Sequence, residues 1–181
     1  MPGDPSSAAF FTALTLLNKN SFLKIKNVGL NPTRIGFYQL LKKHGAKIKF
    51  KNIKKSYNEV FGDIYVKSSV LKPIKASKEY YVKSTDEYPI LFILAALTKG
   101  TSVFKGIKDL ANKESNRIKE MQKVLNQIGI KSLNNKDGIK IFGGKVTKKN
   151  KTIIVPNLGD HRICMSTFVL ALLTGIKTNI K

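Results

Sequence analysis

The sequence predicts an α/β (α+β) fold built from repeated β-α-β-α-β-β units, with buried helices inside and sheets outside. Three segments begin with polar residues and continue as helices that are apolar almost all round, which indicates burial on every side. A short polar turn and a strand follow each of these helices, and such alternation is typical of helices packed under sheets. The three helical segments span Ser6–Leu17, Asp86–Leu97 and Asp160–Leu173.

The first unit is expected to contain a second, amphipathic helix that ends at Gly45, since glycine favours helix C-termini. The second unit has a matching helix that ends at Gly129, and the same offset of 84 positions relates Lys47 to Lys131. Such an internal repeat indicates that both units share one structure. After its buried helix, the first unit is predicted to contain a strand at Ser21–Lys26, a helix at Asn31–His44, and strands at Lys47–Phe50 and Asp63–Ser68.

A strand at Tyr80–Ser84 is predicted to lead into the second unit, and a strand at Thr152–Val155 into the third. The third copy stops after its first helix and strand. We therefore expect one partial domain over residues 1–181, with units at about 1–78, 79–150 and a truncated 151–181. The remaining predicted elements are a strand at Thr101–Ile107, a helix at Glu114–Ile128, and strands at Lys131–Leu133, Gly138–Phe142 and Lys177–Lys181.

The net charge of +22, from 33 basic and 11 acidic residues, allows the interpretation of a polyanion-binding protein. Only three basic residues are arginines, however, and nucleic-acid interfaces depend on arginine for bidentate contacts. The lysines are spread along the whole chain, which favours compositional bias over specific nucleic-acid binding. In a chain that uses lysine by default, Arg34, Arg117 and Arg162 are candidates for sites where a planar guanidinium is required.

The single cysteine, Cys164, excludes an internal disulfide and fits a reducing compartment. No apolar run approaches the roughly 18 residues that span a bilayer, and Met1–Asp4 lacks the basic start of a signal peptide. We therefore expect a cytoplasmic protein without a membrane partner. Two histidines and one cysteine cannot form a zinc site without carboxylates, and the glycine-rich phosphate loop is missing. We expect no cofactor and no metal.

Charged residues gather in two short segments at helix starts. In the first, Lys113, Glu114 and Arg117 are expected in the first turn of the Glu114–Ile128 helix. Cations beside the free N–H groups of a helix start favour an anion. A solvated first turn with a surface Glu–Lys pair is the alternative, and the local pattern alone favours it.

The second charged segment is Gly159–Arg162, in which Asp160 is expected to cap the following helix. His161 is interpreted either as a core histidine or as part of a site. Arg162 stands at the start of a buried helix and needs an anionic partner, from the protein or from a ligand. Because the repeats bring helix starts to one end of the domain, Asp86 is expected to share a face with both segments. Such a face combines carboxylates for proton transfer with cations for an anionic substrate.

Five segments resemble signature segments of the EPSP synthase family and come in the family order over essentially the whole chain. Any one segment is a weak signal, whereas five in order are a strong one. The resemblance implies an enolpyruvyl transferase-like inside-out α/β barrel, in which each of two domains has three β-α-β-α-β-β units with helices inside. The five segments are Gly3–Phe11, Gly29–Arg34, Asp86–Pro89, Asn112–Ile118 and Gly159–Met165.

The resemblance implies transfer of the enolpyruvyl group from phosphoenolpyruvate to the 5-hydroxyl of shikimate 3-phosphate, in chorismate and aromatic amino acid biosynthesis. Asp86 would then be the base toward the shikimate hydroxyl, and Glu114 the proton donor and acceptor at the enolpyruvyl carbon. Lys113 and Asp86 would contact shikimate 3-phosphate, and Arg117 and Arg162 would contact phosphoenolpyruvate. Asp160 and His161 would hold these residues in place without touching a substrate.

Two positions depart from the family pattern, although neither removes a charged group. Asn112 stands where an aliphatic residue is usual, and Cys164 stands where a small residue is common. The N-terminal domain of the family and the end of the third unit lie outside the sequence. We therefore expect a monomeric chain that is truncated at both ends, needs that domain, and is inactive alone. A stand-alone basic binding protein built on the same repeats is the alternative.

Overall fold

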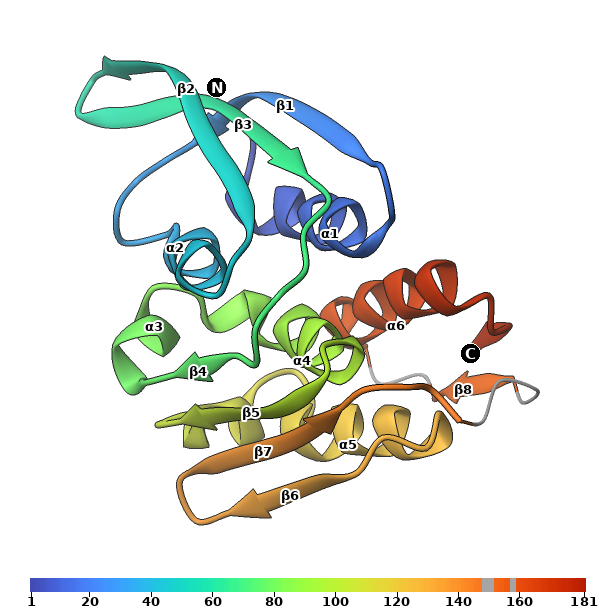
Figure 1. Ribbon diagram of the computed structural model, residues 1–181. Coiled ribbons are helices and arrows are strands. Elements are labelled where there is room, and N and C mark those ends of the chain that lie inside the picture. The colour runs from blue at the N-terminus through green and yellow to red at the C-terminus, as the bar shows by residue number, and fades with distance from the viewer. Residues whose placement is uncertain (148–151, 157–158) are drawn as a thin grey trace.

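The computed structural model describes residues 1–147, 152–156 and 159–181. In its first part, two helices pack under an antiparallel three-stranded sheet with the strand order β1-β3-β2. Lys67 of the central strand lies between Phe22 and Lys47, which fixes the register of all three strands. The elements are α1 (Pro5–Leu17), β1 (Phe22–Gly29), α2 (Gly36–Lys43), β2 (Lys47–Ser56) and β3 (Glu59–Lys67) (Figure 1).

The second part contains a four-stranded sheet with the order β4-β5-β7-β6, in which only β4 and β5 are parallel. Its helices are α3 (Lys78–Val82), the 3₁₀ helix η1 (Thr85–Glu87), α4 (Tyr88–Leu97), the 3₁₀ helix η2 (Lys108–Asn112) and α5 (Arg117–Gln127). Its strands are β4 (Lys75–Ala76), β5 (Gly100–Lys105), β6 (Ser132–Asn135) and β7 (Gly138–Gly143).

The last part is shorter and contains one long helix between two short strands. These elements are β8 (Ile153–Val155), α6 (His161–Thr174) and β9 (Thr178–Ile180), and β8 pairs with β9 in parallel. Figure 1 shows α1 and α4 lying between the β1-β3-β2 sheet and the β4-β5-β7-β6 sheet, with α6 beside them. Helices thus lie inside and sheets outside, as predicted, although the sheets of the described residues do not join into a closed barrel.

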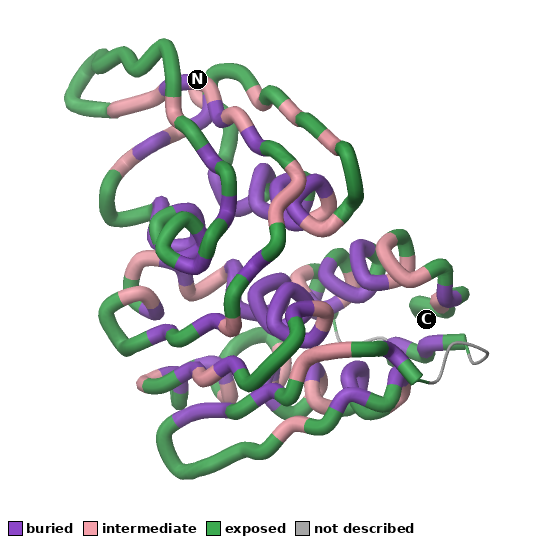
Figure 2. The backbone as a smooth tube through the Cα atoms, in the orientation of Figure 1, coloured by how far each residue is buried: buried purple, intermediate pink, exposed green. Residues whose placement is uncertain are grey.

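Helix α4 forms the centre of the core, because every residue from Tyr88 to Ala96 is buried (Figure 2). It contacts α1, α5 and α6, and its other side packs on β7. An edge-to-face cluster of aromatic rings joins Tyr88 and Phe92 of this helix to Phe104 of β5. The prediction of burial on every side is therefore confirmed for this helix.

The same prediction is wrong for α1 and α6. Phe11 of α1 is 60% exposed, and Phe168 of α6 is 55% exposed. An apolar groove of about 340 Å³ lies between the two helices, with further apolar side chains from Met165 and Leu172 along it. An all-round apolar helix pattern indicates burial, but it does not say which element supplies the covering surface.

The predicted strand at Tyr80–Ser84 is wrong, because this segment belongs to helix α3 and the turn after it. The hydroxyls of Ser84 and Thr85 donate to the carbonyls of Tyr80 and Tyr81, four residues earlier, and these bonds support helical turns. The strand that leads into the second part is instead β4, which pairs with β5.

Two helices begin later than the sequence pattern indicated. Residues 31–35 form a turn in which the Asn31 side chain accepts hydrogen bonds from Thr33, so α2 begins only at Gly36. The Asn116 side chain accepts from the Lys119 N–H as an N-cap, so α5 begins at Arg117. Side-chain capping thus fixes the start of α5, whereas α2 has no side-chain cap and follows the Asn31 turn.

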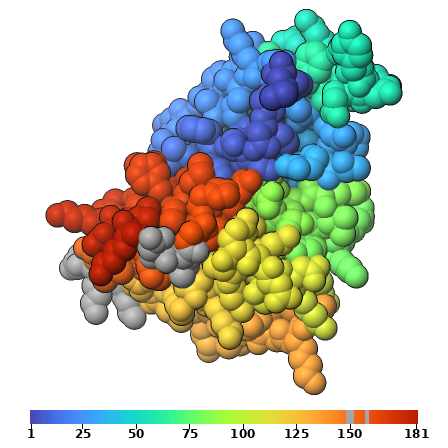
Figure 3. Space-filling view, turned by 180° about the vertical axis from the view of Figure 1, so that it is seen from behind, coloured from blue at the N-terminus to red at the C-terminus, as the bar shows by residue number. Residues whose placement is uncertain are grey.

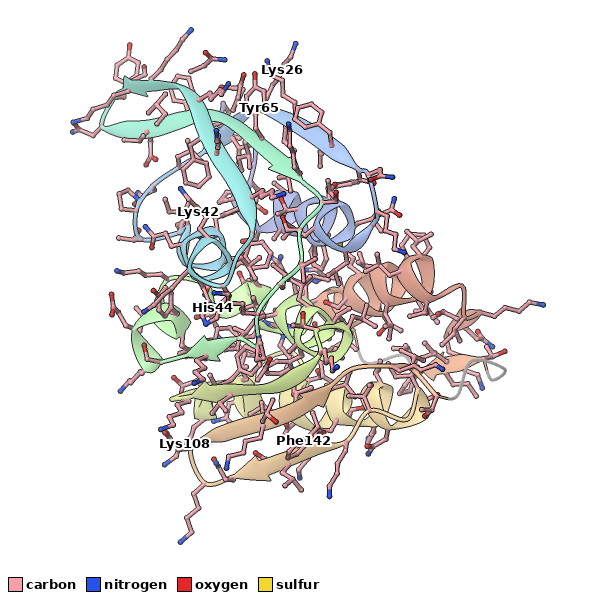
Figure 4. The ribbon with its side chains drawn as sticks, in the orientation of Figure 1. Lys26, Lys42, His44, Tyr65, Lys108 and Phe142 are labelled. Carbon is pink, nitrogen blue, oxygen red and sulfur yellow. The ribbon has the colours of Figure 1, made fainter. Side chains whose placement is uncertain are left out.

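The C-terminal ends of these two helices are as predicted, since Gly45 and Gly129 follow them with positive φ angles. Just before Gly45, the His44 ring links the first part to the second: it contacts the Leu40 carbonyl and accepts a hydrogen bond from the Lys75 N–H (Figure 4). Among the residues that the structure describes, no helix combines the length and apolarity that a membrane crossing requires.

Candidate active site

Arg117 is the centre of a buried charge cluster and the first residue of α5. Its side chain is only 1% exposed, although a guanidinium is costly to remove from water without partners. Its Nε donates to Asp160 Oδ2 at 3.0 Å, its Nη2 to Glu114 Oε2 at 2.6 Å, and its Nη1 to Asp86 Oδ1 at 3.4 Å. One guanidinium therefore joins carboxylates from three separate segments of the chain.

Asp160 fixes this guanidinium from the start of α6, where it is the N-cap as predicted. Its carboxylate accepts from the Arg162 backbone N–H at 3.0 Å and from the Ser115 hydroxyl at 2.8 Å. Burial raises the pKa of the Asp160 carboxyl, but the hydrogen bonds from Arg117 and Ser115 outweigh burial and lower the pKa overall. Asp160 is thus held as an anion whose charge is already neutralised by protein donors.

Asp86 joins a second arginine to the cluster. It lies in η1, its side chain is 39% exposed, and its Oδ2 lies 3.6 Å from Nη2 of Arg162. Arg162 is mostly buried, with a side chain that is 14% exposed. The structure therefore brings Asp86, Glu114, Arg117 and Arg162 into one chain of contacts.

The folding of the helices explains why these residues meet. Helices α1, α4 and α6 contact one another, and α5 packs against both α4 and α6. The ion pairs of Arg117 with Asp86 and Asp160 place the starts of α5 and α6 beside η1, which immediately precedes α4. Figure 3 shows the green, yellow and orange-red segments that contain η1, α5 and α6 meeting on the face seen from behind.

Three of the predicted site residues are exposed. Lys113 is exposed and precedes α5, so its placement in the first helical turn is wrong. Glu114 also precedes the helix, although it contacts Arg117. His161 is exposed at the first position of α6, so its interpretation as a core histidine is wrong.

The sequence did not reveal the hydrogen bond from Ser115 to Asp160 or the burial of Arg117. Ser115 completes the set of donors to Asp160, and its position between Glu114 and the N-cap was the available signal. Asp86 stands at the start of a predicted buried helix, but it does not cap α4, which has no side-chain cap; the Asp86 carboxylate faces the arginines instead. Glu87, the residue directly after Asp86, is buried.

The arrangement is suited to proton transfer beside bound anions. Asp86 and Glu114 are partly open to solvent, the latter with 49% of its side chain exposed, so both carboxylates are accessible for proton exchange. Arg162 has the more accessible guanidinium, a group that forms bidentate contacts with carboxylate or phosphate, whereas all three nitrogens of Arg117 already contact protein carboxylates. Across the described ranges, no three side chains of His, Cys, Asp or Glu are grouped as a metal ion requires.

Comparison with known proteins gives one consistent result. The chain is 43% identical over 173 residues to a 3-phosphoshikimate 1-carboxyvinyltransferase of Petrotoga mobilis and 42% identical over 172 residues to that of Aquifex aeolicus. The match to the Petrotoga protein covers 96% of this chain and 40% of that protein. The match to the Aquifex protein covers 94% of this chain and 39% of that protein. The structure of an EPSP synthase from Acinetobacter baumannii superposes with a TM-score of 0.87 and 35% identity, over 99% of this chain and 40% of that one.

The chain thus spans about 40% of the length of the relatives it matches. The model of the family described as EPSP synthase (3-phosphoshikimate 1-carboxyvinyltransferase) matches residues 1–181, and the chain therefore belongs to the EPSP synthase family.

Proposed function

We propose that this chain carries part of the active site for enolpyruvyl transfer from phosphoenolpyruvate to the 5-hydroxyl of shikimate 3-phosphate. The products are 5-enolpyruvylshikimate 3-phosphate and phosphate, on the route to chorismate. The observation that carries the proposal is the contact of Arg117 with both Glu114 and Asp86, in a chain of this family. That contact unites an anion-binding group with two proton-transfer groups.

In the proposed first step, the substrate hydroxyl oxygen bonds to C2 of phosphoenolpyruvate while its proton passes to Asp86. C3 of phosphoenolpyruvate takes a proton from Glu114, and a tetrahedral intermediate results. In the second step, Glu114 removes a proton from C3, the C2–C3 double bond forms again, and the C2–O bond to phosphate breaks. The departing phosphate takes up one proton from solvent, and Asp86 returns the hydroxyl proton to solvent. The Glu114 carboxyl thus donates a proton to one carbon and later accepts a proton from it, which requires a carboxyl that can reach that carbon in both steps. The half-exposed position of Glu114 supports this role.

The substrates are strongly anionic, and the proposed binding groups have opposite charge. Arg117 and Arg162 contact the carboxylate and phosphate of phosphoenolpyruvate in this proposal, and Lys113 with Asp86 contacts shikimate 3-phosphate. Arg162 then exchanges its contact with Asp86 for a contact with the ligand. Asp160 keeps Arg117 oriented throughout, and His161 is a neighbour of the binding groups without a chemical step.

The proposal includes partners and a location. The substrates lie between this chain and the N-terminal domain of the complete enzyme, which supplies further phosphate-binding groups. We propose a monomeric, cytoplasmic enzyme whose present chain is one domain with repeat units at about 1–78, 79–150 and 151–181. The long α1, α4 and α6 at matching places in the three units support that division.

The proposal is tested with a complete enzyme, in which this chain replaces the matching 173 residues of the Petrotoga mobilis relative. Phosphate release is measured with phosphoenolpyruvate and shikimate 3-phosphate, and each substrate is also supplied alone. We expect steady release only with both substrates and no turnover by the 181-residue chain. A complete enzyme that folds but releases no phosphate contradicts the proposed function.

A further inference from the structure

The segment Lys113–Ser115 carries Glu114, the proton-transfer group at the enolpyruvyl carbon in the proposed function. It connects η2 to α5 and lies outside both helices. Among the described residues, no backbone hydrogen bond joins this segment to the rest of the chain. The hydrogen bonds that hold the segment in place therefore come from its side chains, and one of them comes from a residue to which the proposed function gives no role.

That residue, Ser115, ties the segment to a distant part of the chain. Its hydroxyl donates to Asp160 Oδ2 at 2.8 Å, across 45 positions of sequence. The other hydrogen bond of the segment, from Arg117 to Glu114, spans only three positions and occupies the carboxylate that the proposed reaction needs. Because that carboxylate exchanges protons with the substrate, its own contact cannot fix the segment throughout the reaction, whereas the Ser115 contact can.

The acceptor of the Ser115 hydrogen bond is itself held in place. The Asp160 side chain is 0% exposed, and the oxygen that accepts from Ser115 also accepts from Arg117 Nε at 3.0 Å. Its second oxygen accepts from the Arg162 backbone N–H at 3.0 Å. Hydrogen bonds to an ionised acceptor are stronger than those between neutral groups. Ser115 therefore connects the half-exposed Glu114 to a fully buried and well-anchored carboxylate at the start of α6.

We propose that Ser115 is a positioning residue for proton transfer: its hydrogen bond to Asp160 holds the Lys113–Ser115 segment against α6 and thereby keeps the Glu114 carboxyl within reach of the reacting carbon. This inference rests on the proposed function and deepens it. Ser115 touches no substrate and acts through Glu114. Its loss is costly because proton transfer at carbon depends on the distance and angle between the two groups.

The first test measures turnover by the complete enzyme described under the proposed function. Ser115→Ala should lower kcat for phosphate release by about 10- to 100-fold, since a misplacement of about 1 Å can cost roughly 100-fold. The Kd for phosphoenolpyruvate should change little, because Arg117 and Arg162 keep their contacts with Asp86. Ser115→Thr keeps the hydroxyl and should recover most of the lost rate.

Two further variants separate the hydrogen bond from general effects on the fold. Ser115→Cys keeps a side chain of similar size but donates only weakly, so it should lower kcat as Ser115→Ala does, with less disturbance of packing. Ser132→Ala is the matched control: it removes another partly buried hydroxyl, one that accepts a hydrogen bond from Gln122 of α5. It should leave kcat unchanged. Urea unfolding shows that each variant is folded.

The second test is a double-mutant cycle, which asks whether Ser115 acts through Glu114. If it does, adding Ser115→Ala to Glu114→Gln should lower the rate no further, since positioning matters only for a carboxyl that moves the proton. If Ser115 merely supports the fold, the two losses should multiply. Single-turnover phosphate release measures the rate of the slow double variant.

Two outcomes overturn the inference: near-normal kcat in folded Ser115→Ala and Ser115→Cys, or losses that multiply in the double variant. Failure of the proposed function gives a different result, because Glu114→Gln alone would then keep near-full kcat. In that case Glu114 is not the proton-transfer group, and the inference falls with the proposed function. A large loss in Glu114→Gln together with multiplying losses overturns the role of Ser115 alone.

Discussion

Arg117 Nε and Asp160 Oδ2 lie 3.0 Å apart, and the two side chains are 1% and 0% exposed. This pair joins the start of α5 to the start of α6 across 43 positions of sequence. Each ion by itself would be very costly at such a depth, and the pair is tolerated because Ser115 and the Arg162 N–H provide further hydrogen bonds. The buried pair thus fixes the geometry of the more exposed Glu114 and Asp86.

The first prediction concerns the stability that this pair provides. Asp160→Asn leaves the Arg117 guanidinium buried with one anionic partner fewer, and it should lower the free energy of unfolding by about 3–5 kcal/mol. Because the pKa of Asp160 is lowered in the folded state, its contribution is complete above the ordinary value of 3.8 and is lost as pH falls through the lowered pKa. The difference between variant and wild type should therefore shrink on acidification.

Urea unfolding at several pH values measures this effect. The matched control is Glu79→Gln, which removes the exposed pair with Lys83 on α3 and should change the free energy of unfolding by less than about 0.5 kcal/mol. If Asp160→Asn cost no more than Glu79→Gln at neutral pH, the buried pair would not be a stabilising contact.

A second prediction compares two phenylalanines that the sequence pattern treats alike. Phe92 of α4 is fully buried, whereas Phe168 of α6 is 55% exposed. Phe92→Ala should lower the free energy of unfolding by about 3–5 kcal/mol through lost burial and a cavity. Phe168→Ala should cost well under about 1 kcal/mol in the 181-residue chain. Equal losses in thermal or urea unfolding would contradict the difference in burial.

These two helices also show how far the sequence could predict the fold. The pattern of apolar residues located α1, α4 and α6, because helix periodicity depends on neighbouring residues alone. It could not reveal that Phe168 lacks a covering element, since that depends on tertiary contacts. The strand prediction at Tyr80–Ser84 failed for a related reason: β-favouring tyrosines were held in helical turns by the hydroxyls of Ser84 and Thr85.

The candidate site was predictable in part. Charged residues at the starts of otherwise apolar segments are unusual, and this signal identified Asp86 and Arg162. At Arg117 the local pattern favoured a solvated first turn, and the family resemblance pointed to the site. The sequence could not show that Arg117 is buried, nor that Asp86 faces two arginines instead of capping α4. Both facts arise from packing between segments that are distant in sequence, and local charge patterns contain no information about it.

The third prediction concerns the net charge of +22. On β1, β3 and β2, Lys24 and Lys49 flank Tyr65 by register, and the Lys24 Nζ lies 5.1 Å from the centre of that ring. Figure 4 shows Lys26 and Tyr65 on this part of the molecule. If the charge is compositional, binding of oligonucleotides should be weak, independent of sequence and lost by about 200 mM salt.

Fluorescence anisotropy with single- and double-stranded oligonucleotides at two salt concentrations tests this prediction. Replacing Lys24 and Lys49 with glutamine should weaken binding equally for all sequences. Sub-micromolar, sequence-dependent binding at physiological salt would favour a nucleic-acid function instead.

The fourth prediction concerns Arg162 in the complete enzyme. Arg162→Lys keeps the charge but replaces a planar fork with a point charge, so bidentate contact with a carboxylate or phosphate is lost. We expect a higher KM for phosphoenolpyruvate, with a smaller effect on the KM for shikimate 3-phosphate. Arg34→Lys is the matched control, because Arg34 contacts Ser6 and Asp4 instead of the proposed ligand. A similar rise in KM for both variants would argue against a direct contact by Arg162.

The last prediction concerns the chemical role of Glu114. Glu114→Gln removes a proton-transfer group but keeps the size of the side chain and one oxygen for the contact with Arg117. General acid–base groups typically contribute on the order of 100- to 10,000-fold, so kcat for phosphate release should fall within that range. Because Arg117 remains bound to Asp160 and Asp86, the affinity for both substrates should change little.

Steady-state phosphate release gives kcat, and ligand titration of the same variant gives the affinities. Glu120→Gln, in the first turn of α5, controls for the loss of a negative charge. Near-full turnover by Glu114→Gln would show that another group moves the proton at the enolpyruvyl carbon.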